Sequence, residues 1–151
     1  MPDTLPGADG RWPDPRRLLP AVRRRYLASH EGLAALFDHL DRHGPARAPA
    51  PRRAAEIARC GSATLKRRFR LLGAGTPARF VKRWRLRCAR RLLRNPFLAV
   101  KQVAHRCGLP NPSAFSRDFQ AEFGVSPTEY RRRRLASRDA ADRPRAALQR
   151  V

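Results

Sequence analysis

The chain has 151 residues, and its 34 lysine and arginine residues against 12 acidic ones give it a formal net charge of +22. This length suits one ordinary domain or two very small ones. The charge excludes the neutral or acidic surface that is typical of cytosolic enzymes, and it favours a polyanionic partner, either nucleic acid or an anionic membrane.

The N-terminal part of the chain predicts little regular structure. Residues 1–15 are rich in proline and glycine, which predicts disorder, and residues 18–27 fit a short basic helix. The first twenty residues hold five prolines and three aspartates without an apolar run, so they are no secretory signal. We therefore expect residues 1–32 to form a short, partly disordered segment of a cytoplasmic, nucleoid-associated protein.

Two helices with apolar faces follow. Leu33, Leu36, Phe37 and Leu40 recur at the spacing of one face of a helix, which we expect to end at Gly44. Residues 45–51 alternate proline with other residues and predict a stiff linker. Residues 54–59 predict a short helix, and Gly61-Ser62 predicts a tight turn after it.

The middle of the chain predicts a helix with Leu65, Phe69 and Leu72 on its inner face. Thr76-Pro77 then marks a strong helix start, with threonine as N-cap and proline at the first position. The helix from residue 77 to residue 93 is about 25 Å long at 1.5 Å per residue. Its expected buried side chains are Phe80, Val81, Trp84, Cys88, Ala89 and Leu92.

The last third of the chain also predicts helices. Val100 and Val103 mark a short helix that ends at Gly108, where a glycine supplies the turn. Asn111-Pro112 and Ser126-Pro127 start two more helices, the first of which turns Phe115 and Phe119 inward. Residues 132–151 are basic without apolar periodicity, so we expect a disordered tail. Strand-like alternation is absent throughout the sequence, which predicts an all-α fold.

The chain contains an internal repeat with an offset of 50 residues. Residues 65–69 align with residues 115–119, and residues 76–80 align with residues 126–130. Each copy consists of a short helix, a turn, a second helix and a capped third helix, which is the arrangement of a helix-turn-helix unit. The sequence therefore predicts two helix-turn-helix subdomains, over residues 33–95 and 96–131, joined by a long connecting helix.

In each unit, one face of the second helix packs inward and the opposite face is free to enter the major groove of DNA. Arginine and lysine match the acceptors of guanine, glutamine matches adenine, and serine serves several bases. The expected DNA-binding residues of the first unit are Ser62, Ala63, Lys66, Arg67 and Arg70. Those of the second unit are Asn111, Ser113, Ser116, Arg117 and Gln120.

The distribution of charge supports a phosphate-bearing partner. Residues 57–117 contain sixteen lysines and arginines and no aspartate or glutamate, whereas a surface that needs only solubility mixes its signs. The exposed side of the connecting helix is expected to place some of its basic residues on phosphates and to leave the others solvated. These residues are Lys82, Arg83, Arg87, Arg90, Arg91 and Arg94.

Four stretches of the sequence resemble the DNA-binding domain of the AraC/XylS family of bacterial transcription regulators. They read RLRCARRLL at residues 85–93, VKQVAHRCGL at 100–109, SAFSRDF at 113–119 and FGVSPTEYR at 123–131. The resemblance covers residues 33–131 and implies sequence-specific binding of double-stranded DNA, followed by recruitment or blocking of RNA polymerase. Most family members carry a large N-terminal effector domain, so the resemblance implies either a stand-alone regulator that binds DNA as a monomer or a truncated family remnant.

Two other classes of function stay open on the sequence alone. A non-specific nucleic-acid-binding protein would use the charge without reading bases, and an enzyme's detached DNA-binding domain is a weaker alternative. We expect no enzymatic activity, cofactor or metal, because His39 and His43 lack a third ligand nearby and the three cysteines lack a base partner. Trp84 is expected in the core.

Overall fold

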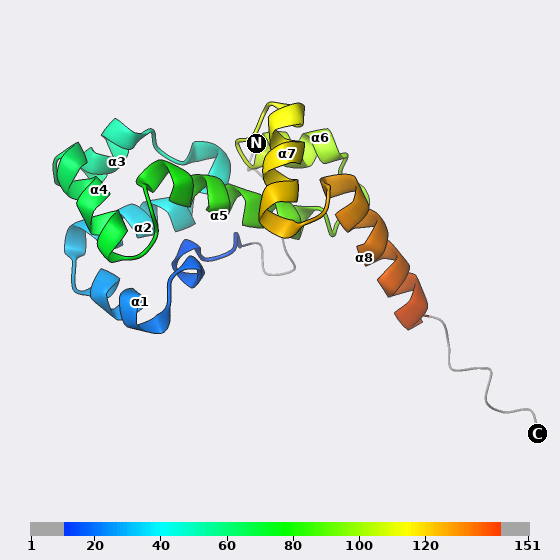
Figure 1. Ribbon diagram of the computed structural model, residues 1–151, viewed down its shortest axis with the longest axis horizontal. Helices are drawn as coiled ribbons and strands as arrows, with labels where there is room; N and C mark the ends of the chain where they lie inside the picture. Colours follow the sequence, from blue (N-terminus) through cyan, green and yellow to red (C-terminus); the bar gives the residue numbers. More distant parts are fainter. Residues whose placement is uncertain (1–10, 143–151) are drawn as a thin grey trace, which may run out of the picture.

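The computed structural model describes residues 11–142, and every regular element within that range is helical (Figure 1). The all-α prediction is therefore confirmed. The α-helices are α1 (Ala21–Ala28), α2 (Glu31–His43), α3 (Pro51–Ile57), α4 (Ser62–Leu71), α5 (Pro77–Leu92), α6 (Val100–Arg106), α7 (Pro112–Phe123) and α8 (Pro127–Asp142). Two short 3-10 helices are η1 (Pro15–Leu18) and η2 (Pro45–Arg47).

The first helix-turn-helix unit packs α2, α3 and α4 against the N-terminal half of α5. Its core contains three phenylalanines, Phe37 from α2, Phe69 from α4 and Phe80 from α5, with ring centroids 5.2 to 6.0 Å apart. All three side chains are buried. Leu65 and Leu72 are buried beside them, as the helical spacing predicts. The sequence periodicity therefore predicts the packing of this unit correctly.

The second unit packs α6 and α7 against α5, and α8 against α7. Phe119 lies at its centre, with ring centroids 5.7 Å from Phe115, 4.6 Å from Phe123 and 5.8 Å from Tyr130. Asn111 and Ser126 cap the starts of α7 and α8, where their side chains accept from the backbone N–H groups of Ala114 and Glu129. Both predicted helix starts are thus confirmed.

The helix α5 runs through the centre of the molecule and belongs to both units (Figure 1). It begins as predicted, since the Oγ1 atom of Thr76 accepts from the N–H of Arg79 at 3.2 Å. Trp84 is completely buried in the middle of the helix, and its Nε1–H donates to the carbonyl oxygen of Pro13 at 2.7 Å. The core position predicted for Trp84 is confirmed. The hydrogen bond ties the N-terminal segment to the connecting helix.

The two helix-turn-helix turns use the same backbone geometry but different residues. After α6, Gly108 has φ +70, and the N–H of Leu109 donates back to the carbonyl of Ala104 at 2.9 Å. After α3, the corresponding residue is Arg59 with φ 49, the one non-glycine residue with positive φ in the described chain. Gly61 has ordinary extended φ and ψ values as the N-cap of α4. The predicted turn at Gly61-Ser62 is therefore wrong in position, because the left-handed residue comes two positions earlier.

Replacing Arg59 by glycine is expected to stabilise the protein by about 0.5–1 kcal/mol. A left-handed conformation costs an L-residue more than glycine, and this gain exceeds the extra backbone entropy of glycine in the unfolded chain. The midpoint and slope of urea denaturation, followed by helicity, measure the change. Gly108→Ala is the reciprocal variant and should destabilise, because a Cβ there would lie 3.1 Å from both Arg85 Nε and the Pro45 oxygen. A lower midpoint for Arg59→Gly would contradict this explanation.

Residues 45–51 do not act as a detached linker. Pro45 is buried, and η2 packs against α2, α5 and α6. The carbonyl oxygen of Pro45 accepts from Nε of Arg85 on α5 at 3.0 Å, and the turn glycine Gly108 lies against both groups. Proline-rich composition predicts stiffness, but it does not reveal this long-range hydrogen bond. The segment therefore joins the first unit to the turn of the second.

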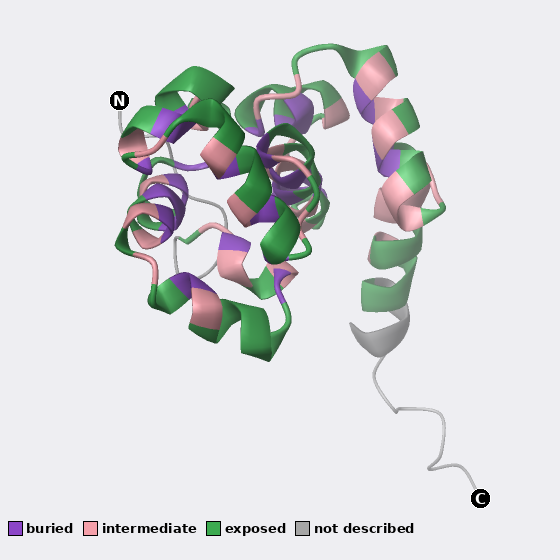
Figure 2. Cartoon of the chain, turned by 60° about the vertical axis from the view of Figure 1, so that its left-hand side comes forward, coloured by how far each residue is buried: buried purple, intermediate pink, exposed green. Residues whose placement is uncertain are grey.

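Both ends of the described chain are more ordered than the sequence predicts. Trp12 packs on the core beside Gly44, and Pro15 is buried. The short basic helix expected over residues 18–27 is present as α1, which begins three residues later than expected, and η1 precedes it. The helix α8 continues to Asp142 and projects from the body, and most of its residues up to residue 138 are exposed (Figure 2). The predicted disorder is therefore wrong for residues 11–15 and 132–142, while residues 1–10 and 143–151 lie outside the described residues.

Candidate nucleic-acid interface

The helix α4 turns its predicted DNA-binding residues outward. Leu65 and Phe69 anchor its inner side in the core. The opposite side exposes all five of the residues expected to bind DNA in the first unit, and two of the three basic ones are neighbours on one turn. These exposed residues are Ser62, Ala63, Lys66, Arg67 and Arg70. The buried residues Leu65 and Phe69 lie next to the exposed basic residues in the sequence of α4. The core therefore fixes the backbone that carries the basic side chains.

The helix α7 presents the corresponding set of the second unit. Ser113, Arg117 and Gln120 are exposed, and Ser116 is half-buried between them. Asn111 lies at the N-cap, where its Oδ1 accepts from the N–H of Ala114 at 3.0 Å. Its side-chain oxygen is thus used by the helix cap, and its amide N–H₂ group is what it can offer to DNA.

Two ion pairs turn the carboxylates of α7 away from this outer face. Asp118 pairs with Lys82 of α5 at 2.7 Å, and Glu122 pairs with Arg83 of α5 at 3.2 Å. The guanidinium of Arg117 has no hydrogen bond or ion pair with any other residue in the described range. The outer face of α7 therefore carries a free guanidinium without a neighbouring carboxylate to compete with a phosphate or a base.

The same ion pairs correct the expectation for α5. Lys82 and Arg83 dock α7 onto the connecting helix, so they are not simply free to meet phosphates. The guanidinium of Arg90 lies 4.7 Å from the ring centroid of Phe123, a cation–π contact with the second unit. Part of the α5 face that the sequence predicts to be exposed is therefore in contact with α7. The spacing of the acids at i and i+4 on α7, matched to adjacent basic residues on α5, is the signal that could have indicated it.

An arginine-lined cleft lies on another side of α5. It has a volume of about 970 Å³ and is bordered by the N-terminal segment, α2, α5 and α8. Burial and the neighbouring charge of Arg90 lower the pKa of Arg87, whose Nε is buried without a hydrogen-bond partner among the described residues. The arginines that line the cleft are Arg11, Arg17, Arg87, Arg90, Arg91, Arg94 and Arg134. Nothing in the sequence indicates that Arg11, Arg17 and Arg134 join this set.

The arginines of the basic run at residues 131–134 have different roles on α8. Nε of Arg131 donates to the carbonyl oxygen of Leu93 at 3.3 Å, which fixes α8 to the end of α5. Arg132 and Arg133 share Glu129, at 2.8 and 2.6 Å. These two hydrogen bonds lower the pKa of Glu129 to about 2. Arg134 reaches the cleft instead.

Replacing Arg132, Arg133 and Arg134 by alanine is expected to weaken binding about equally on every DNA sequence. Because these side chains lie beyond the recognition helices, we expect any contact they make with DNA to be with phosphates and not with base edges. The slope of log affinity against log salt should fall by up to about one unit for each phosphate that these side chains no longer neutralise. Binding titrations at several salt concentrations measure it, with Arg25→Ala on α1 as the control for a general reduction of positive charge. A change in base preference would contradict the assignment.

Other candidate sites do not assemble. His39 and His43 stack with ring centroids 4.1 Å apart, and Nδ1 of His43 contacts the carbonyl of His39. Among the described residues, no three His, Cys, Asp or Glu side chains come together as a metal site. The cysteines are free thiols, and burial raises the pKa of Cys107 to about 12. A thiol of this kind is a poor nucleophile at neutral pH. In the part of the chain that the structure describes, no helix has the length and apolarity needed to cross a membrane.

Comparison with protein families identifies the helix-turn-helix region. A family model described as a helix-turn-helix domain matches residues 54–133. The HTH-type transcriptional regulator CdhR of Pseudomonas aeruginosa is 36% identical over 113 residues, which are 73% of this chain and 32% of CdhR. The HTH-type transcriptional activator RhaS of Enterobacter sp. (strain 638) is 42% identical over 74 residues, 49% of this chain and 27% of RhaS. The chain thus spans about a third of the length of these curated relatives.

Solved structures extend the similarity to three dimensions. The DNA-binding domain of the global transcriptional factor AdpA, solved in complex with a target DNA, superposes with a TM-score of 0.61 and 33% identity. The match covers 72% of this chain and 94% of the AdpA chain. An AraC-type regulator from Chromobacterium violaceum superposes with a TM-score of 0.65 at 21% identity, covering 71% of this chain and 95% of that one. The second match supports the fold, and the first also relates this chain to a protein seen on DNA.

Proposed function

The chain belongs to the AraC-type family of helix-turn-helix proteins, and from this premise we propose that it regulates transcription by sequence-specific binding of double-stranded DNA. Its two recognition helices, α4 and α7, read two successive segments of the major groove. The DNA complex of the AdpA domain is the solved precedent for a relative of this kind.

The observation that carries the proposal is the pair of exposed, carboxylate-free faces on one rigid frame. The connecting helix α5 has 16 residues, about 24 Å at 1.5 Å per residue, and it is shared by both cores. One turn of B-DNA is roughly 34 Å long, so two recognition helices held on one such helix can reach neighbouring groove segments on one side of the duplex. A protein that only neutralised phosphates would need neither the repeat nor the fixed spacing.

Each exposed residue has a role that follows from its chemistry. In the first unit, Lys66, Arg67 and Arg70 contact guanines or flanking phosphates. The smaller Ser62 and Ala63 lie at the start of α4 and allow the helix to approach the base edges closely. We assign the first unit to residues 33–95.

The second unit, which we assign to residues 96–131, carries the more specific reading. Arg117 contacts guanine, Gln120 contacts adenine, and Ser113 and Ser116 contact bases or sugars beside them. Asn111 donates its amide to a phosphate at the start of α7, where the helix N-terminus also favours an anion.

The biological context follows from the family. We infer that the protein is not an enzyme, works in the cytoplasm on the nucleoid, binds its site as a monomer, and acts by recruiting or blocking RNA polymerase. The asymmetry of the two recognition faces supports monomeric binding, because two different units on one chain fit a site without two-fold symmetry.

The rival proposal is a non-specific nucleic-acid-binding protein, or a family remnant without regulatory function, that uses only the net charge. Selection of bound fragments from genomic DNA, followed by titration of the best fragment and of random DNA at physiological salt, separates the two. A specific regulator should prefer its site by about 10³-fold or more. Equal affinity for selected and random DNA would overturn the proposal and favour the rival.

A further inference from the structure

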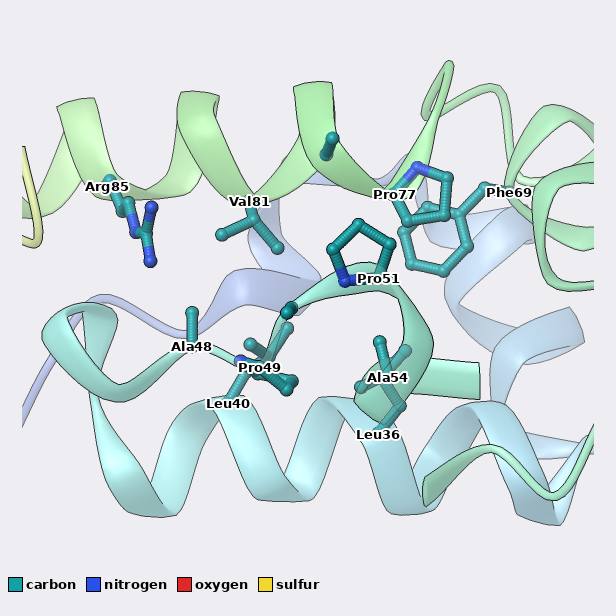
Figure 3. Close-up of a pocket in the computed structure, with 12 residues that line it drawn as sticks. Leu36, Leu40, Ala48, Pro49, Pro51, Ala54, Phe69, Pro77, Val81 and Arg85 are labelled. Carbon is teal, nitrogen blue, oxygen red and sulfur yellow. The ribbon is translucent and has the colours of Figure 1, made fainter. Parts of the chain in front are cut away.

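An apolar cavity that is open to the surface lies in the first unit, away from the outward faces of α4 and α7. It has a volume of about 290 Å³ and lies between α2 and α5, with the segment before α3 closing one side (Figure 3). Leu36 and Leu40 form its floor, and Val81 faces them from α5 (Figure 3). Ala78 of α5 also lines the cavity. This volume is close to the lower limit of pockets that hold small organic ligands.

A single charged side chain lines this cavity. Arg85 of α5 lies at one end of the cavity (Figure 3). The other lining residues are leucine, alanine, proline, valine and phenylalanine. Nε of Arg85 donates to the carbonyl oxygen of Pro45 at 3.0 Å. The terminal nitrogens of Arg85 have no hydrogen-bond partner within residues 11–142. Burial lowers the pKa of its guanidinium, because partly apolar surroundings disfavour the charged form.

A half-buried guanidinium with free terminal N–H groups beside an apolar cavity matches one class of ligand. The planar fork of arginine binds a carboxylate through two parallel hydrogen bonds, and the apolar lining favours a hydrocarbon tail. We propose that this cavity binds a small hydrophobic monocarboxylate, with its carboxylate on Arg85 and its tail between α2 and α5.

The position of Arg85 connects this site to DNA binding, a step that rests on the function proposed above. Its Nε and the Pro45 oxygen that it contacts both lie against Gly108, at the turn between α6 and α7. A ligand that draws the guanidinium into the cavity acts on the contact that joins the first unit to the second. Occupancy of the cavity therefore alters the placement of α7 relative to α4, and with it the affinity for a site that needs both helices.

Binding can be tested on the free protein by calorimetric titration with nonanoate, a ligand of about eleven non-hydrogen atoms that fits a cavity of this size. The expected result is one site per chain with a dissociation constant of the order of 0.1–1 mM. The isosteric neutral amide, nonanamide, should bind at least about tenfold more weakly because it cannot form the charge-assisted fork. No binding of nonanoate, or equal binding of the amide, would overturn the proposal.

Two variants separate the cavity from the surface. Ala78→Phe places a ring in the cavity from an exposed position on α5 and should abolish nonanoate binding. Ala35→Phe adds the same ring to an exposed position of α2 outside the cavity and should leave binding unchanged. Thermal unfolding of both variants verifies that they fold. Retained binding in Ala78→Phe, or abolished binding in a folded Ala35→Phe, would overturn the location.

The link to DNA is measured separately, with the selected DNA fragment in the presence and absence of saturating nonanoate. The expected result is a change of about threefold or more in the dissociation constant for DNA, absent from Ala78→Phe. Calorimetric binding without this change would overturn the coupling but not the site. Failure of the DNA fragment to bind at all would bear on the proposed function and leave the calorimetric result intact.

Discussion

Replacing Trp84 by alanine is expected to destabilise the protein by about 3–5 kcal/mol, the range found for removal of a buried aromatic side chain. The indole is completely buried at the middle of α5, where both units use the same helix. Small domains have a total stability of about 5–15 kcal/mol, so this single change removes a large share of it. Urea denaturation followed by circular dichroism measures the destabilisation.

A second substitution at the same position separates packing from hydrogen bonding. Trp84→Phe keeps most of the buried ring but removes the Nε1–H that donates to Pro13 at 2.7 Å. It should cost about 1–3 kcal/mol, because the carbonyl oxygen of Pro13 is left without its donor. If Trp84→Phe were as damaging as Trp84→Ala, the attachment of the N-terminal segment would matter more than the core. A destabilisation below about 1 kcal/mol for Trp84→Ala would contradict the core position itself.

The helices that pack a face into the core could be predicted from the sequence. The spacing of Leu33 to Leu40 predicts α2, and the caps at Thr76, Asn111 and Ser126 predict three helix starts with their hydrogen bonds. These signals are local, since apolar spacing and a cap both act within one or two turns. The same periodicity predicts the exposed positions on α4 and α7, because residues on the helix face opposite the apolar one point away from the core.

The length of α8 could not be predicted in this way. Apolar periodicity indicates which side chains are buried, and between residues 127 and 138 only Pro127 of α8 is buried, with Tyr130 partly buried. Arginine and alanine nevertheless favour a helix by their intrinsic propensity. Glu129 adds ion pairs with Arg132 and Arg133 at the i+3 and i+4 positions. Helicity without burial is thus the reason why the basic run continues as a helix to Asp142.

Contacts between distant segments were the other part that the sequence did not reveal. The hydrogen bond from Arg85 to Pro45 and the ion pairs of Lys82 and Arg83 with α7 join residues about 40 positions apart. Composition predicts a positively charged surface but not which charges are used inside the molecule. As a result, the phosphate-contact residues expected on α5 included two that hold the units together.

Replacing Arg117 by alanine is expected to relax base preference at one position of the binding site. A bidentate contact between arginine and guanine accounts for about 1–3 kcal/mol of discrimination, roughly 5- to 150-fold in affinity. Arg117 is exposed on α7 between the buried anchors Phe115 and Phe119, so its backbone is fixed. Asp118 and Glu122, the carboxylates that could have held it on the surface, pair with α5 instead.

Titrations against sites varied one base pair at a time measure the effect, and two further variants define its cause. Arg117→Lys keeps the charge but lacks the planar fork, so it should restore overall affinity more than base preference. Arg106→Ala removes an exposed arginine from α6 of the same unit and should weaken binding evenly, without a change of preference. An unchanged preference profile in Arg117→Ala with normal helicity would show that Arg117 contacts only phosphate. In that event Gln120, one turn further along the same exposed face, becomes the residue through which α7 distinguishes bases.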